Sequence, residues 1–143
     1  MINWKYQGKI ISSTDDFPNK EAVIGFVYLV QNVYDYWYIG KKSIWSHTTK
    51  PPLKGFKRRR KFTKESDWAT YKSSNKSVKD WESWEFKSRI IIDFAYSKKH
   101  LTYLECHAQF SMNCLTNDMC LNDNILGKFY SGDLVNLPIN EIK

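Results

Sequence analysis

The sequence has no long apolar segment. None of its hydrophobic runs approaches the roughly 18 residues that a membrane-spanning helix needs. The first residues, MINWKYQGKIISSTDD, also lack the order of a charged stretch followed by an apolar stretch that marks a secretory signal. We therefore expect a soluble protein that contacts no membrane and stays in the cytoplasm.

Cysteine is scarce. The three cysteines form an odd number, and they sit too far apart for a short-spaced zinc pair. Only one histidine, His107, lies close to them in the sequence. We therefore interpret Cys106, Cys114 and Cys120 as reduced core thiols rather than as a disulfide framework or a metal site.

The chain also lacks internal repeats and low-complexity linkers. Its 143 residues have the size of one domain, and a hydrophobic content of 42% is enough for a single core. We expect one domain over residues 23–143, preceded by an extension, residues 1–22, to which the sequence assigns no role.

Acidic residues are missing from one segment. Between Lys41 and Lys64 there are ten lysines and arginines and no acid. The rest of the chain holds 12 basic residues against all 15 acidic ones, so the net charge of +7 comes from this segment. Its centre, KGFKRRRK, follows the pair Pro51-Pro52, which predicts an irregular loop.

This basic loop has two interpretations. It can be a solvated or disordered surface segment, or it can bind nucleic acid. Aromatic residues interleaved with the charges, Trp45, Phe56 and Phe62, suit a surface that meets phosphates and sugars or bases. Nucleic acid is therefore the leading partner, and the residues expected to contact it are Lys54, Lys57, Arg58, Arg59, Arg60 and Lys61.

Local patterns predict an α/β fold with a small, mainly antiparallel three-stranded sheet flanked by helices. Residue type and periodicity predict strands over Val23–Val30, Tyr36–Ile39 and Phe86–Phe94. A short helix is expected over Lys64–Lys72, and a further helical turn carries Trp81 and Trp84. A longer helix from about Lys98 to Met112 is expected to have Ser97 as its cap.

The first two strands form a hairpin rich in tyrosine. If the loop Gln31–Asp35 closes symmetrically, Tyr28 lies directly opposite Tyr38 on one face of the sheet. Gly40 lies on the same face and would leave open backbone for a ligand. The alternative is an aromatic pair that only packs in the core.

The residues GFVY, followed after nine residues by YIG, resemble the two-part signature of the GIY-YIG nuclease family. Phe-Val-Tyr stands where Gly-Ile-Tyr is usual, and the tyrosine is kept. The segments KGFKRRRKFTKESDWATYKSS and YLECHAQF are similar to segments of small phage-encoded members. The resemblance covers Ile24 to Phe129, and three motifs in order form a fairly specific signal.

The resemblance implies roles for several residues. Tyr28 and Tyr38 would be the paired active-site tyrosines, with Tyr28 favoured to help activate a metal-bound water. A tyrosine with an ordinary pKa of about 10 needs a nearby cation or metal for this role, and Lys41 or Lys42 could supply it. The family's phosphate-stabilising arginine would be one of three, Arg58, Arg59 or Arg60, with Arg60 favoured, and Arg89, Lys41 and Lys42 next in line.

The same resemblance implies that Glu105 holds one Mg²⁺ or Mn²⁺ ion. Glu105 also falls within the apolar stripe of the last predicted helix, where a carboxylate is unfavourable unless something pairs with it. The alternative is a glutamate at the edge of that face, reaching solvent or a lysine. Asn122 matches an asparagine near the family's C-terminal end and is expected to contact nucleic acid, although Asn124 competes for this assignment. The alternative is that both are turn residues.

Together these features predict a metal-dependent DNA endonuclease of low sequence specificity that acts on double-stranded DNA, as a monomer or a homodimer. If a phage encodes it, it would act in the host cytoplasm. The alternative is a catalytically inactive, nuclease-like protein that binds nucleic acid. The altered first motif keeps this alternative open.

Overall fold

The computed structural model describes residues 1–134, so residues 135–143 of the predicted domain lie outside the described residues. The chain order of its helices and strands is β1 (Trp4–Tyr6), β2 (Lys9–Ile11), β3 (Gly25–Asn32), β4 (Trp37–Ser43), β5 (Trp45–Lys50), β6 (Arg60–Glu65), α1 (Lys76–Lys79), β7 (Phe86–Ala95), α2 (Lys98–Ser111), β8 (Asn124–Ile125) and β9 (Phe129–Tyr130). Short 3-10 turns lie at Thr14–Asp16, Ser83–Glu85 and Ser131–Asp133.

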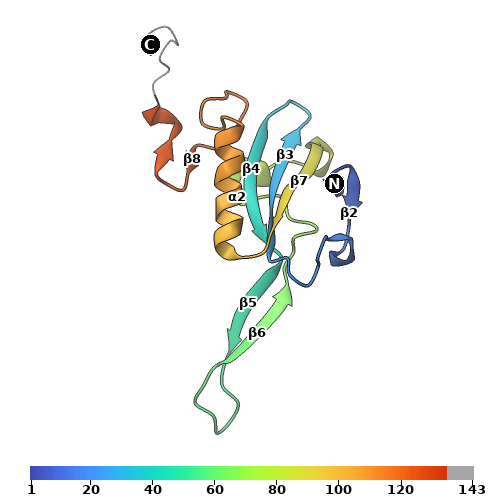
Figure 1. Cartoon of the computed structure of the whole chain (residues 1–143), viewed down its shortest axis with the longest axis vertical. Coiled ribbons are helices and arrows are strands. Elements are labelled where there is room, and N and C mark those ends of the chain that lie inside the picture. Colours follow the sequence, from blue (N-terminus) through green and yellow to red (C-terminus); the bar gives the residue numbers. More distant parts are fainter. Residues whose placement is uncertain (135–143) are drawn as a thin grey trace.

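The central sheet has five strands in the order β2-β1-β7-β3-β4, rather than the predicted three (Figure 1). β1 runs parallel to β7, and the other neighbouring pairs are antiparallel. The two additional strands come from residues 1–22. Each is three residues long, too short to show a periodicity. Trp4 on β1 is buried and donates a hydrogen bond to the carbonyl of Trp68 (2.9 Å), which ties the start of the chain to the core.

The two faces of the sheet are covered differently. α2 packs on one face, where Val27, Leu101 and Ala108 share a cluster of buried side chains (Figure 1). The other face carries Phe26 and Tyr28 in the larger cluster and is covered by irregular chain. The prediction of α2 is confirmed, including its cap, since the side chain of Ser97 accepts a hydrogen bond from the N–H of His100.

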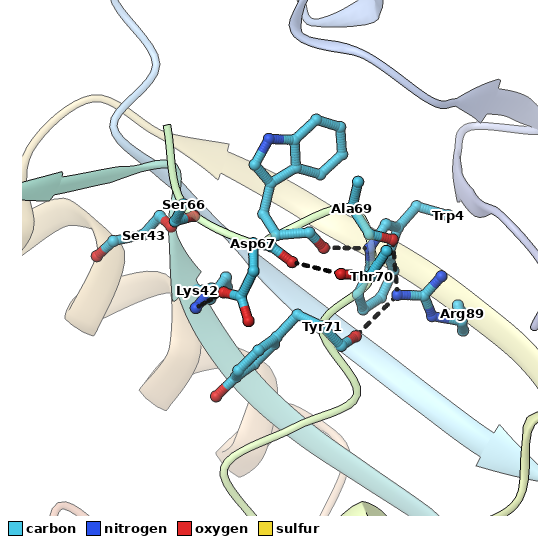
Figure 2. A network of polar contacts seen from close by, with 10 residues as sticks. Trp4, Lys42, Ser43, Ser66, Asp67, Ala69, Thr70, Tyr71 and Arg89 are labelled. Carbon is cyan, nitrogen blue, oxygen red and sulfur yellow. Dashed lines mark hydrogen bonds and ion pairs between the residues drawn. The ribbon is translucent and has the colours of Figure 1, made fainter. Parts of the chain in front are cut away.

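The helix predicted over Lys64–Lys72 is wrong. β6 extends to Glu65, and the chain then crosses the sheet without helical structure. The guanidinium of Arg89 donates to the carbonyls of Ala69 (3.2 Å) and Tyr71 (2.8 Å), as Figure 2 shows. Backbone groups that a helix would pair internally are therefore used to anchor this segment to β7.

Arg89 is itself a buried structural residue. It lies over the ring of Trp4 at 4.0 Å, donates also to the carbonyl of Ile2 (2.8 Å), and is 3% exposed. Burial lowers the pKa of Arg89 to about 10. A phosphate could not reach this guanidinium without disrupting the core. Arg89 is therefore unsuited to the phosphate-stabilising role for which it was the next candidate after Arg58, Arg59 and Arg60.

The β3–β4 register differs by two residues from the predicted one. Val30 lies opposite Tyr38, and Tyr28 lies opposite Gly40. The cause is Asn32, whose buried side-chain oxygen accepts the N–H groups of Tyr34 and Tyr36 (both 3.0 Å) and tightens the turn. Tyr28 and Tyr38 are therefore diagonal neighbours on the same face, with ring centroids 6.3 Å apart.

Gly40 does not leave space for a ligand, contrary to the prediction. The ring of Tyr28 fills this space: a Cβ at Gly40 would lie 2.5 Å from the Tyr28 hydroxyl and 2.8 Å from a carbon of Tyr38. Glycine is needed here because the rings lie against the backbone.

We expect Gly40→Ala to lower the free energy of unfolding by about 1–3 kcal/mol, the usual range for an overpacked core. Urea denaturation measures this loss. Gly132→Ala is the matched control, because no atom lies within 4 Å of its added methyl group and its backbone is not left-handed. Equal stability of the two variants would show that the tyrosine rings move aside freely.

The basic segment predicted as a loop is largely a β-hairpin. β5 and β6 form a separate two-stranded sheet that projects away from the central sheet and α2 (Figure 1). Residues 51–59 connect the two strands at its tip. A turn with a hydrogen bond from the N–H of Phe56 to the carbonyl of Leu53 (2.9 Å) shapes this tip, and Gly55 supplies the positive φ of 88°.

Two further features of the structure are the length of its helices and the state of its cysteines. Within residues 1–134, no helix is long and apolar enough to cross a membrane. The three cysteines are free thiols, with Cys114 buried and the other two half-buried.

Candidate active site

The segment from Met119 to Asn122 covers the first half of the outer edge of β4. The N–H of Trp37 donates to the carbonyl of Met119 (3.0 Å), and the N–H of Leu121 donates to the carbonyl of Trp37 (2.8 Å). The side chain of Asn122 then pairs with both backbone groups of Ile39. These hydrogen bonds fix the backbone of β4 as far as Ile39, directly before Gly40 and Lys41.

Beyond Ile39 this edge borders a mainly polar pocket of about 320 Å³ between α2, β4 and residues 122–127. The pocket brings together three of the predicted catalytic residues. Its lining consists of Tyr38, Lys41, Asn75, Glu105, Gln109, Asn122, Asp123, Asn124, Leu126 and Gly127.

Glu105 lies on α2 between the buried residues Leu101 and Ala108 and borders the pocket. Burial raises the pKa of the Glu105 carboxyl, and the positive charge of Lys41 opposes this shift. In the part of the chain that the structure describes, the Glu105 carboxylate forms no salt bridge. It is therefore a partly desolvated carboxylate without an ionic partner, and its environment favours an added cation.

Lys41 and Lys42 point to opposite faces of β4, because side chains alternate along a strand. The ammonium of Lys41 donates to the hydroxyl of Thr102 on α2 (3.0 Å) and lines the pocket. The ammonium of Lys42 forms an ion pair with Asp67 (2.7 Å) and lies 3.9 Å from the centre of the Tyr71 ring (Figure 2). Of the two lysines, Lys41 is the one that borders the pocket.

Tyr38 is half-buried and reaches the pocket from the face of β4 opposite Lys41. Burial raises the pKa of Tyr38, and the negative charge of Glu105 raises it further. At neutral pH the side chain is therefore a neutral phenol, which can donate a hydrogen bond to an anionic oxygen.

Tyr28 is separated from the pocket. Its side chain is 0% exposed, and its hydroxyl lies 3.0 Å from the hydroxyl of the buried Ser73. Burial also raises the pKa of Tyr28, so the expectation that Lys41 or Lys42 favours its phenolate is wrong. In this structure Tyr28 packs against Tyr38 and does not line the pocket.

The three arginines of the basic run lie in the β5–β6 hairpin and its tip, and none of them lines the pocket. Arg60 opposes Lys50 near the tip and donates from Nε to the carbonyl of Pro51 (3.3 Å). Arg58 and Arg59 are exposed, as are Lys54, Lys57 and Lys61. The sequence register that favoured Arg60 does not apply, because these residues form a hairpin of their own.

Asn122 has a structural contact that the sequence did not predict. Its Oδ1 accepts the N–H of Ile39 (2.9 Å), and its Nδ2 donates to the carbonyl of Ile39 (2.8 Å). Gln109 on α2 donates to the same carbonyl (3.2 Å). Gln109 was missed, although it lies four residues after Glu105 and so on the same face of a helix. The competing Asn124 also lines the pocket and accepts the N–H of Gly127 (2.9 Å).

The residues around Glu105 fit a hard divalent cation. Mg²⁺ typically takes one or two carboxylates and completes its shell with water and phosphate oxygens. Residues 1–134 contain no cluster of three or more acidic, histidine or cysteine ligands. Glu105, with Asp123 lining the same pocket, provides the sparse oxygen set that such an ion accepts.

Comparison with known proteins identifies the family of the chain. The family model described as putative endonuclease segE, GIY-YIG domain, matches residues 4–131. The searches of curated proteins and of solved structures gave no match. The matched region includes β1, both tyrosines of the hairpin, the β5–β6 hairpin, Glu105 and Asn122. Because the match spans most of the sequence, the chain belongs to the segE-type GIY-YIG endonuclease family.

Proposed function

We propose that the protein is a metal-dependent DNA endonuclease whose catalytic centre is the pocket at the open edge of β4. The observation that carries this proposal is the convergence of Tyr38, Lys41 and Glu105 on that pocket from β4 and α2. The cations of the hairpin favour a nucleic acid as the substrate through contacts with phosphates, and such contacts carry no sequence information directly. The endonuclease family favours DNA. Low sequence specificity is the expected result.

Hydrolysis adds water across a phosphodiester bond: the water oxygen bonds to phosphorus, and one ester oxygen leaves with a proton. Glu105 would hold a Mg²⁺ or Mn²⁺ ion, which would supply Lewis acidity for the hydrolysis when bound. Lys41 neutralises charge that develops on the phosphate, because its ammonium borders the same pocket. The phenol of Tyr38 donates a hydrogen bond to the phosphate or orients the water.

In this mechanism Tyr28 is a positioning residue. Its ring lies against Gly40 and Tyr38, and its hydroxyl contacts Ser73. This assignment reverses the order of importance expected from the family signature, in which the first tyrosine acts on the water.

We expect Tyr38→Phe to lower cleavage by at least about 10²-fold, the lower range for a positioned acid-base group, with little change in stability. Tyr28→Phe should lower stability by about 1 kcal/mol through its lost hydrogen bond and reduce turnover much less. Single-turnover rates and urea denaturation of both variants separate these effects. A larger rate loss in Tyr28→Phe would support the first tyrosine as the reacting group.

The function is tested with purified protein and supercoiled plasmid, single-stranded DNA or RNA, each with Mg²⁺, Mn²⁺ or EDTA. We expect cleavage of the plasmid in either metal and none in EDTA. One pocket cuts one strand at a time, so a monomer should give nicked circles first, whereas a homodimer can give linear product in one event. Binding without cleavage in both metals would favour the inactive DNA-binding alternative.

A further inference from the structure

The β5–β6 hairpin has two unlike faces, because side chains alternate along each strand. Trp45, His47 and Thr63 share one face of the hairpin. Together with Ile24 and Lys98, which lie outside the hairpin, they line a pocket of about 330 Å³. This face is therefore turned toward the rest of the domain at the end of the hairpin where β5 begins. The opposite face, which we call the ribbon face, consists of Ser46, Thr48, Lys50, Arg60, Phe62 and Lys64.

The ribbon face holds its cations over an aromatic ring. The ammonium of Lys50 lies 4.3 Å from the centre of the Phe62 ring, and the guanidinium of Arg60 lies 5.4 Å from it. Cation–π contacts of this kind orient long side chains that would otherwise move freely. They also occupy the aromatic face on which an unpaired base would stack, so the ribbon face suits duplex better than single-stranded nucleic acid.

The shape of the hairpin fits one groove of DNA. A two-stranded ribbon can enter the major groove of B-form DNA, which is about 12 Å wide, but not the minor groove, which is about 6 Å wide. Six residues per strand give the ribbon a length of roughly 20 Å. Neither strand pairs with the central sheet, so the hairpin can enter a groove without breaking the fold.

The positive charge of the hairpin indicates that its ligand is a polyanion. From Lys50 to Lys64 the chain carries lysines and arginines and no acidic residue. At the tip, Phe56 is 70% exposed, which is unfavourable in water and suits contact with apolar groups such as thymine methyls in the major groove. Exposed lysines also protect strand edges from aggregation, but that role requires neither a face free of acidic residues nor an exposed phenylalanine.

We propose that the β5–β6 hairpin is a DNA-binding ribbon that lies in the major groove of B-form duplex DNA with its ribbon face toward the base edges. Lys50, Arg60 and Lys64 contact the phosphates that flank the groove, and the basic tip follows the backbone. The choice of DNA rests on the proposed function. The ribbon thereby selects duplex DNA and sets the orientation in which the duplex reaches the pocket at β4.

The groove is tested by equilibrium binding of the full chain in EDTA, followed by fluorescence anisotropy. The probes are a B-form DNA duplex, an RNA duplex of the same sequence, and a DNA duplex with bulky C5-substituted pyrimidines that fill the major groove. We expect binding at least about tenfold weaker to the RNA duplex, because its A-form major groove is deep and narrow. Binding to the C5-substituted DNA duplex should weaken by a similar factor, because the substituents fill its major groove. Equal affinity for all three duplexes, or tighter binding to anionic lipid vesicles, would overturn the proposal.

The face is tested by four charge-matched variants. Lys50→Gln and Lys64→Gln should each flatten the slope of log affinity against log salt by about 0.9, the value for one lost phosphate contact. Lys61→Gln, on the opposite face, should change the slope less, and Lys9→Gln on β2 should not change it. Equal losses at positions 50, 61 and 64 would mean a diffuse cationic surface and would overturn the docked ribbon.

These measurements distinguish a failure of the groove-binding proposal from a failure of the proposed nuclease function. Because binding is followed in EDTA, a protein that enters the groove but never cuts would fail only the proposed function. A protein that cuts plasmid in Mg²⁺ yet binds all duplexes equally would fail only the ribbon proposal.

Discussion

Replacing Glu105 by glutamine should lower cleavage by at least about 10³-fold in Mg²⁺, with DNA binding retained. Glutamine has nearly the same shape as glutamate but no charge, so it removes the carboxylate that holds the cation. Metal ions supply several kcal/mol of stabilisation to the charged transition state, and each 1.36 kcal/mol corresponds to a factor of ten in rate. Single-turnover cleavage and binding in EDTA, measured on the same preparation, check both parts.

The same variant should be at least as stable as the wild type. Burial raises the pKa of Glu105, which means that folding disfavours its charged form. A carboxyl group with a raised pKa binds more protons in the folded than in the unfolded protein. It therefore lowers stability as the pH rises through its folded pKa. Glutamine removes that effect, so Glu105→Gln should unfold at an equal or higher urea concentration at neutral pH.

Glu21→Gln is the matched control, since Glu21 is exposed and distant in sequence from the pocket residues. In the wild type, a proton and the cation compete for Glu105, so half-maximal cleavage should need more Mg²⁺ as the pH falls toward the raised pKa. Near-wild-type cutting by Glu105→Gln in Mg²⁺ would remove Glu105 from the mechanism.

Replacing Lys41 by alanine should lower turnover at saturating DNA by about 10²- to 10³-fold, the usual loss for one donor to a developing oxyanion. Its contact strengthens in the transition state, so lowering the salt concentration should not restore the rate. Cleavage at saturating DNA and at two salt concentrations measures this effect. Lys5→Ala, an exposed lysine on β1, is the control.

The arginines of the hairpin should behave differently. Arg58→Ala, Arg59→Ala and Arg60→Ala should each weaken binding, and low salt or saturating DNA should restore turnover. A large, salt-insensitive loss confined to Arg60→Ala would contradict the assignment to Lys41. It would mean that the hairpin folds back over the pocket when DNA binds.

Strong periodicity and local motifs predicted much of the framework. β3 and β7 were predicted from runs of apolar, β-branched and aromatic residues, and α2 was predicted from its apolar stripe and from Ser97 as an effective cap. β1 and β2 were missed, since three-residue strands show no period and are held by long-range contacts such as that of Trp4. The helix predicted over Lys64–Lys72 is wrong because Arg89, distant in sequence, takes its carbonyls.

The candidate site was predicted in part for similar reasons. Tyr38, Lys41 and Glu105 lie within or next to recognisable motifs, and the structure brings them to one pocket. The burial of Tyr28 depends on packing across the sheet, which a motif does not show. The separation of Arg60 from the pocket depends on the hairpin folding as its own sheet, which composition alone presented as a loop.

The most direct measurement of the catalytic centre is a crystal structure of the protein with Mn²⁺ and a short DNA duplex that carries hydrolysis-resistant phosphate analogues at every linkage, using Glu105 in its native form. We predict an anomalous Mn²⁺ peak at the Glu105 carboxylate and a backbone phosphate within hydrogen-bonding distance of Lys41 and Tyr38. A metal and phosphate bound elsewhere, with no DNA at the pocket beside β4, would contradict the account.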